Sequence, residues 1–161
     1  MKFKEDARYF YFIAEASNEL ADLQNQTVWQ SALLKSKDYF LKNGVISLDH
    51  RHRNCLPKNL RGDRRYIVGE PVSVETQGTT TLVTGRLYKD NNMARIIIEL
   101  LRRGSNRVKA SIGGLGPQRL DSPDGRRSVV SFLWDDVALT VAPVNNTLKP
   151  ARGIKISEKE W

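Results

Sequence analysis

The chain has 161 residues, of which 40% are hydrophobic and 27% charged, and this composition is that of one ordinary globular domain with a single core. Its 26 Lys and Arg against 18 Asp and Glu give a formal net charge of +8, which favours acidic proteins or nucleic acid as partners. One cysteine, Cys55, excludes an intrachain disulfide. No apolar run approaches the ~18 residues of a membrane span, and the charged N-terminus lacks a signal-peptide core, so we expect a cytoplasmic protein without membrane contact.

Residues 5–41 carry apolar side chains at spacings of three and four without proline, which predicts one or two helices. Gly44 follows, and glycine readily takes the left-handed conformation that ends a helix. A short apolar strand, Val45–Leu48, then leads into Asp49 and His50. The polar and basic residues 51–65 predict a loop beside this histidine.

Strands are predicted at residues 66–68, 72–74 and 80–84, with a hairpin tip at Gln77 and Gly78. Between Leu87 and Gly104 the apolar residues change to a helical period. That predicted apolar stripe consists of Met93, Ile96, Ile97, Leu100 and Leu101.

The last third of the chain predicts a strand over 108–112, a second turn at 122–125 and a strong strand region over 128–141. A glycine-rich turn is predicted between them, formed by Gly113, Gly114, Gly116 and Pro117. The tail after Pro150 lacks periodicity and is expected to be extended or mobile.

These elements predict an α+β fold, a curled or closed antiparallel β-barrel flanked by helices. We divide the chain into an N-terminal helical segment (1–43), a main domain (44–148) and a C-terminal tail (149–161).

Three residues at element boundaries have the chemistry of a serine hydrolase. Ser111 is the candidate nucleophile, His50 the base and Asp136 the acid that orients the base. An ordinary imidazole, with a pKa of ~6.5, is able to accept the serine proton near neutral pH. His52 and Asp135 are the alternates, because each lies within two residues of the preferred one.

The backbone N–H groups of Ile112, Gly113 and Gly114 are candidate donors to an oxyanion. Glycines let neighbouring N–H groups point the same way, although the same two glycines would equally serve a plain turn.

A zinc site is the competing interpretation of the histidine segment, with Asp49, His50, His52 and Cys55 as ligands. The chain has no distant Cys/His pair to complete it, so the metal signature is weak and we expect neither a metal nor another cofactor. Cys55 as a nucleophile is weaker still, because no glycine-rich element lies beside it.

Several ordered motifs resemble the prohead maturation proteases of tailed phages, a serine protease family related in fold to the herpesvirus assemblins. The resemblance covers residues 44–148. It is carried by Asp49-His50, by Gly69-Glu70-Pro71, by Thr84-Gly85-Arg86-Leu87-Tyr88, by Ala110-Ser111-Ile112-Gly113-Gly114, by Asp136-Val137-Ala138-Leu139-Thr140 and by Pro143-Val144-Asn145. Ala138 departs from the pattern, since a serine is common there.

The resemblance implies an assemblin-like fold and a serine endopeptidase of capsid assembly. Its substrates would be the scaffold protein, the major capsid protein and the protease itself, inside the assembling prohead in the host cytoplasm. By this resemblance, His50, Ser111 and Asp136 would take the family's catalytic roles. The sequence leaves open a homo-oligomer, a weak contact with nucleic acid, the cleavage motif and whether the chain is precursor or self-processed form.

The alternative function is a non-enzymatic capsid-associated module that binds acidic scaffold or DNA through its basic surface.

Overall fold

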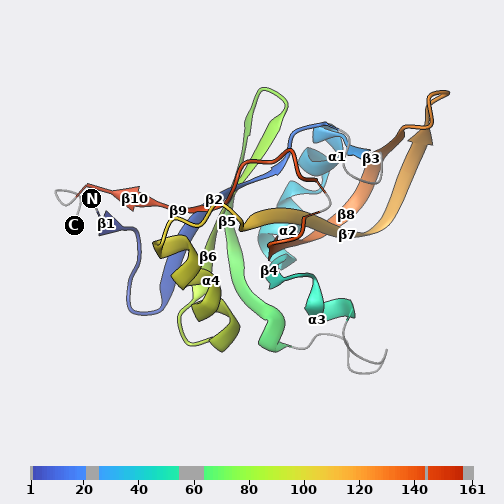
Figure 1. Cartoon of the computed structure of the whole chain (residues 1–161). Helices are drawn as coiled ribbons and strands as arrows, with labels where there is room; N and C mark the ends of the chain where they lie inside the picture. The colour runs from blue at the N-terminus through green and yellow to red at the C-terminus, as the bar shows by residue number, and fades with distance from the viewer. Residues whose placement is uncertain (1, 21–25, 55–63, 144, 158–161) are drawn as a thin grey trace.

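The computed structural model describes residues 2–20, 26–54, 64–143 and 145–157. Its strands are β1 (Lys2–Phe3), β2 (Tyr9–Ser17), β3 (Gln26–Val28), β4 (Val45–Leu48), β5 (Ile67–Gln77), β6 (Thr80–Tyr88), β7 (Lys109–Asp121), β8 (Arg127–Thr140), β9 (Arg152–Gly153) and β10 (Lys155–Ile156). Its helices are α1 (Gln30–Lys35), α2 (Lys37–Asn43), α3 (Arg51–Asn54), the 3₁₀ turn η2 (Arg64–Tyr66) and α4 (Asn92–Arg102). Figure 1 shows α4 on one side of the sheet region and α1 and α2 close to β8.

One large mixed sheet organises the fold, and its hydrogen-bonded order is β3-β8-β4-β5-β6-β2-β9. β3 and β4 pair with different parts of one edge of β8, and β7 pairs along its other edge. The α+β class is confirmed. The expected antiparallel barrel is wrong in two respects: β3 and β4 both pair with β8 in parallel, and the described strands form no closed ring. The connection through α1 and α2 lets β3 and β4 run in the same direction, and the long chain between β4 and β8 supplies the crossover that parallel neighbours require.

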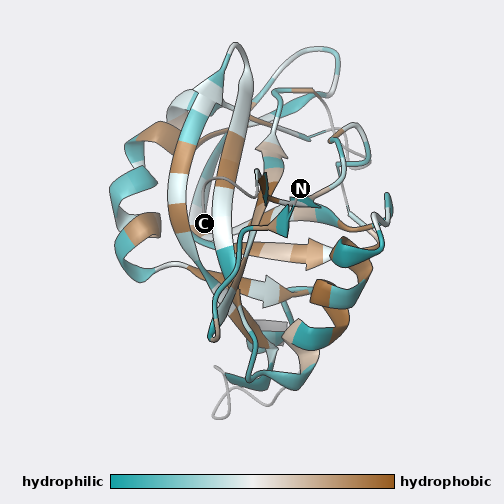
Figure 2. Cartoon of the chain, turned by 90° about the vertical axis from the view of Figure 1, so that its left-hand side faces the viewer, coloured by the Kyte–Doolittle hydropathy of each residue, from teal (hydrophilic) through white to brown (hydrophobic). Residues whose placement is uncertain are grey.

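The expected N-terminal helical segment is wrong before Gln30. Residues 9–17 form β2, in which alternate residues are buried, Phe10, Phe12 and Ala14 among them. A spacing of four, as between Phe12 and Ala16, fits both a helix and a strand, and here the aromatic residues favour the strand. β2 pairs with β6 inside the main sheet, so the first part of the chain belongs to the same core. Figure 2 shows apolar and polar residues alternating along such strands.

The helices predicted at the second half of this segment are present, and α2 ends at Asn43 as expected. Gly44 itself is extended, with φ of −74°, and is not a left-handed cap. A side chain at Gly44 would collide with the ring and the carbonyl oxygen of Phe40, so close packing is what requires glycine there. The predicted loop over 51–65 contains α3 and the start of η2, and its residues 55–63, Cys55 among them, lie outside the described part.

The strands predicted at 66–68 and 72–74 are one continuous strand, β5, and the predicted hairpin tip to β6 is confirmed, with Gly78 in a left-handed conformation. The predicted helix before Gly104 is α4, capped by the Asn91 side chain. Its buried face is rotated relative to the predicted stripe, because Ile98 is buried whereas Ile96 is 60% exposed.

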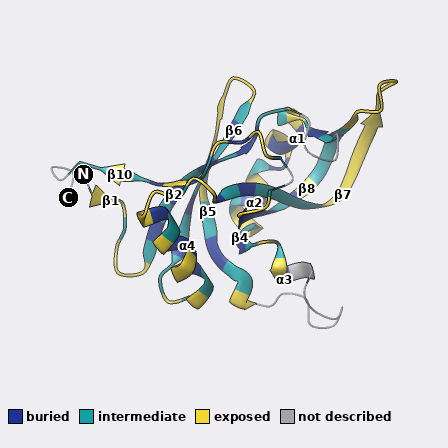
Figure 3. Ribbon diagram, viewed as in Figure 1, coloured by how far each residue is buried: buried dark blue, intermediate teal, exposed yellow. Residues whose placement is uncertain are grey.

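The predicted glycine-rich turn at 113–117 is wrong, because β7 runs through it to Asp121. Gly116 and Pro117 instead lie at a bulge, one of the few places in a sheet that accept proline. The outer halves of β7 and β8 project from the body, and that of β7 is largely exposed (Figures 1 and 3). The tail is extended, as expected, with β9 against β2 and β10 against β1.

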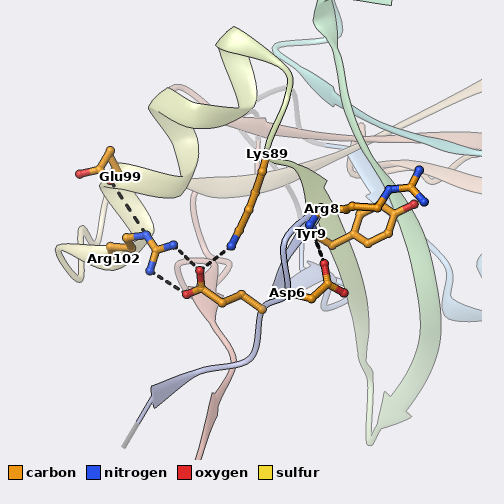
Figure 4. A network of polar contacts seen from close by, with 7 residues as sticks. Asp6, Arg8, Tyr9, Lys89, Glu99 and Arg102 are labelled. Atoms are coloured by element: carbon orange, nitrogen blue, oxygen red, sulfur yellow. Dashed lines mark hydrogen bonds and ion pairs between the residues drawn. The ribbon is translucent and has the colours of Figure 1, made fainter.

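A charge cluster fastens the N-terminal strands to α4 (Figure 4). The Glu5 carboxylate accepts two hydrogen bonds from Arg102, at 2.6 and 2.7 Å, and one from Lys89 Nζ at 2.6 Å. The Arg102 guanidinium, helped by Lys89 and opposed by partial burial, lowers the pKa of Glu5 from 4.5 to about 2. The ionised carboxylate is therefore favoured in the folded state.

Glu5→Gln should lower the free energy of unfolding at pH 7 by on the order of 1 kcal/mol, since these partly exposed ion pairs are screened by solvent. Because the folded pKa lies below the unfolded one, this stabilisation is complete above pH 4.5 and is lost as the pH falls to about 2. Urea unfolding of both proteins across this range measures it. Glu99→Gln is the control, since Glu99 is 60% exposed and 4.0 Å from Arg102; a difference that persists unchanged at pH 2 would contradict the prediction.

Candidate functional site

The structure brings Ser111, His50 and Asp136 together in one hydrogen-bonded chain. His50 Nε2 lies 3.1 Å from Ser111 Oγ, and His50 Nδ1 lies 2.5 Å from Asp136 Oδ2. Asp136 is fully buried, while the His50 side chain is 24% exposed. A serine, an imidazole and a buried carboxylate in this order have the arrangement of a nucleophile, a general base and the group that orients the base.

Strand pairing explains how Ser111 and Asp136 reach one another. On β7, Ser111 and Gly113 are two residues apart and share a face. Their partners on β8 are Ala138 and Asp136, so these four residues form one patch of the sheet. Three of the four are small, which leaves room for an imidazole ring between the serine and the carboxylate.

A β-bulge selects Asp136 over Asp135. Gly113 pairs with Asp136 and Gly114 with Trp134, so Asp135 is the extra residue on β8. Asp136 is buried against His50, whereas Asp135 is only half-buried. The bulge interrupts the regular alternation of side chains that was expected here, so the pairing of Asp136 with Gly113 places it at His50. The bulge itself has no sequence signal.

The bulge is held from behind by the helices. The Trp134 N–H donates to Ser36 Oγ, between α1 and α2, at 2.8 Å, and the Trp134 indole N–H donates to the Asp136 carbonyl at 3.1 Å. The Trp134 ring stacks on Phe40 of α2, with centroids 4.0 Å apart. Asp136 is therefore anchored by its backbone as well as through His50.

His50 is presented by a strained turn. Asp49 and His50 have φ of 52° and 56°, a left-handed conformation that is uncommon outside glycine. The Asp49 N–H donates to the Leu139 carbonyl at 3.3 Å, which attaches the turn to β8. Strain of this kind is kept only where the surroundings enforce it, and it clusters at functional sites.

Gly113 provides the space in which His50 and Asp136 meet. A Cβ atom on Gly113 would lie 2.9 Å from Asp136 Oδ2 and 3.1 Å from His50 Nδ1, closer than such contacts normally allow. The sequence analysis singled out Gly113 for its backbone N–H, and the structure adds this steric role. In a paired strand, successive N–H groups point to opposite edges, so adjacent residues among Ile112, Gly113 and Gly114 are unable to direct both N–H groups at one oxygen. Their role as oxyanion donors stays a prediction.

Two cavities meet at His50 and Ile112 and extend along β7 in opposite directions. The larger, of about 480 Å³, includes Ser111 and is mostly apolar, with Leu20 and Val141 in its wall. The smaller, of about 280 Å³, includes Gly113, Gly114 and Arg119. Together the two cavities form a cleft, and an extended polypeptide bound along this cleft would pass Ser111 Oγ.

His52 lies buried on α3, and the imidazole at Ser111 is that of His50. Among the described residues no group of three His, Cys, Asp or Glu side chains is arranged to hold a metal ion. Within the same residues, no helix is long and apolar enough to cross a membrane.

Comparison with known proteins gives a likeness in structure and none in sequence. No protein-family model and no curated protein match this sequence. The fold is similar to that of the bacteriophage T4 capsid assembly protease gp21, with a TM-score of 0.62 and 13% identity. The match covers 83% of this chain and 82% of that one. The chain therefore has a fold like that of a prohead protease.

Gly113→Ala should separate the imidazole from the carboxylate, since the added methyl group would occupy the space between them. The downfield proton NMR signal of the His50 Nδ1–H should shift or disappear while circular dichroism stays native. Gln118→Ala, at an exposed position of the same strand, is the control. A His50 signal that is unchanged in Gly113→Ala would contradict the steric role.

Proposed function

We propose that this protein is a serine endopeptidase of phage capsid assembly, which cleaves segments of scaffold and capsid protein, and itself, inside the assembling prohead. The observation that carries the proposal is the hydrogen-bonded chain from Ser111 through His50 to the buried Asp136, open to a cleft. The fold similarity to the T4 capsid assembly protease supports the same class of activity and directs it to capsid-related substrates.

In the proposed reaction, His50 Nε2 takes the proton of Ser111 Oγ as that oxygen attacks the substrate carbonyl carbon. The resulting imidazolium is stabilised by Asp136 and then gives its proton to the leaving amine. The C–N bond breaks and an ester to Ser111 remains. A water molecule, deprotonated by His50, hydrolyses this ester and restores the serine.

Ser111→Ala should leave a folded protein whose peptidase activity is at least ~10³-fold lower, since the nucleophile is lost. Digestion of an unbiased peptide library, and mass measurement after incubation of the protein alone or with scaffold, test this. In the unaltered protein a fluorophosphonate should label Ser111 alone. Salt-dependent binding of scaffold without any cleavage would favour the non-enzymatic capsid-associated module instead.

His50→Ala should abolish cleavage, whereas His52→Ala should reduce it only modestly, because only the His50 imidazole is bonded to Ser111 Oγ. The two variants remove the same side chain two positions apart and so control one another. Equal and complete loss in both would indicate a relay of two histidines. Activity that depends on an added metal ion would revive the zinc interpretation.

Asp136→Asn should lower the cleavage rate by ~10⁴ and leave Ser111 open to labelling, because the carboxylate orients the base and stabilises its charged form. Asp135→Asn makes the same chemical change at the bulged neighbour and should stay close to the original rate. Rates of cleavage of one library-derived peptide by both variants test this. A larger effect from Asp135→Asn would refute the assignment.

A further inference from the structure

A third cavity, of about 890 Å³, lies near the start of α4 and is rich in arginine. We call it the arginine cavity, because Arg8 before β2, Arg64 of η2 and Arg95 of α4 line it. Among the residues that the structure describes, no carboxylate forms an ion pair with any of these three. Three arginine residues thus line one concave surface, and none of them is ion-paired within the described residues.

Hydrogen bonds hold the three segments in place. The Asn91 side-chain amide donates to the carbonyls of Arg65 and Ile67, at 3.1 and 3.2 Å, which ties η2 and β5 to the start of α4. The Lys89 N–H donates to the Arg8 carbonyl at 2.9 Å. Arg95 Nε donates to the Lys89 carbonyl at 2.8 Å, which orients the guanidinium and leaves its two terminal nitrogens for a ligand.

The remaining charges of the wall do not neutralise the arginines. The Lys89 ammonium is paired with Glu5 and points toward it (Figure 4). Asp90 is the acidic residue of the lining, against three arginines. Guanidinium groups match carboxylate and phosphate oxygens in a planar, two-pronged geometry, so the ligand chemistry that fits is anionic.

Strand β2 connects the arginine cavity to the cleft at Ser111. Tyr9, at the start of β2, lines the arginine cavity, and Ala16 and Ser17, at its end, line the cleft. The two ends are about 23 Å apart at ~3.3 Å per residue. An extended polypeptide would cover that distance with roughly eight residues.

We propose that the arginine cavity binds an acidic segment of the polypeptide substrate, about ten residues away from the bond that Ser111 attacks. Its role in recruiting substrate rests on the proposed peptidase function. An acidic peptide fits better than a nucleic acid. A nucleic acid carries a phosphate on every nucleotide, so one of its phosphates would face the Asp90 carboxylate and be repelled by it. A peptide is able to place its carboxylates opposite the arginines and uncharged residues opposite Asp90.

The test measures binding of a fluorescently labelled, glutamate-rich dodecapeptide to the Ser111→Ala protein by anisotropy. This readout needs no cleavage, so it is independent of whether the proposed peptidase function holds. Replacing Arg8, Arg64 and Arg95 by Gln should weaken binding about tenfold, an effect that falls with added salt. The single variant Arg8→Gln changes an exposed position and should weaken peptide binding about twofold. It replaces the triple variant in the test if that variant misfolds.

A matched control replaces three exposed arginines outside the cavity, Arg103, Arg107 and Arg126, by Gln and removes the same charge. Unchanged affinity in this control, with the loss in the cavity variant, supports the proposal. Equal losses in both triple variants would mean that binding follows net charge alone and would overturn it. Tighter binding of a twelve-residue oligothymidylate than of the peptide, lost in the cavity variant, would also overturn it.

Discussion

The pairing of β8 along both edges is the constraint on which the candidate site depends. β7 lies on one edge and brings Ser111 beside Ala138, while β4 lies on the other and ends next to Leu139. The turn after β4 then has only a short distance to cover before His50 reaches the serine. Since β8 carries Asp136 and pairs with the strands that lead to Ser111 and His50, the spacing of the three groups is set by backbone hydrogen bonds that many residues share. Single surface changes will hardly alter this spacing.

The three site residues could be predicted from the sequence because each follows or begins a clear apolar run. Val45–Leu48 before His50 is a short apolar strand with the predicted limits, and the strand predicted over 128–141, which carries Asp136, is β8. Residues 9–17 were assigned wrongly, since the apolar spacings there fit both periods and only pairing with β6 decides for a strand. The parallel pairing of β4 with β8 could not be predicted from sequence patterns either, because it joins residues about 90 positions apart.

Three local features of the candidate site have no signal in a single sequence. The extra residue at Asp135 is visible only once β7 and β8 are aligned. The left-handed conformation of Asp49 and His50 is uncommon outside glycine and does not follow from the residue types alone. Gly113 looks like a turn residue because glycine usually is one, whereas here its missing side chain makes room for the imidazole and the carboxylate.

The burial of Asp136 has an energetic consequence for the proposed reaction. Its Oδ2 is bonded to His50, but its Oδ1 is buried with no hydrogen-bond partner among the described residues. A buried carboxylate with one neutral partner is poorly compensated, whereas an imidazolium offers it an opposite charge at the same distance. In the proposed reaction that charge develops as His50 takes the serine proton. The pair is therefore matched better to the transition state than to the resting state, which is the condition under which an interaction speeds a reaction.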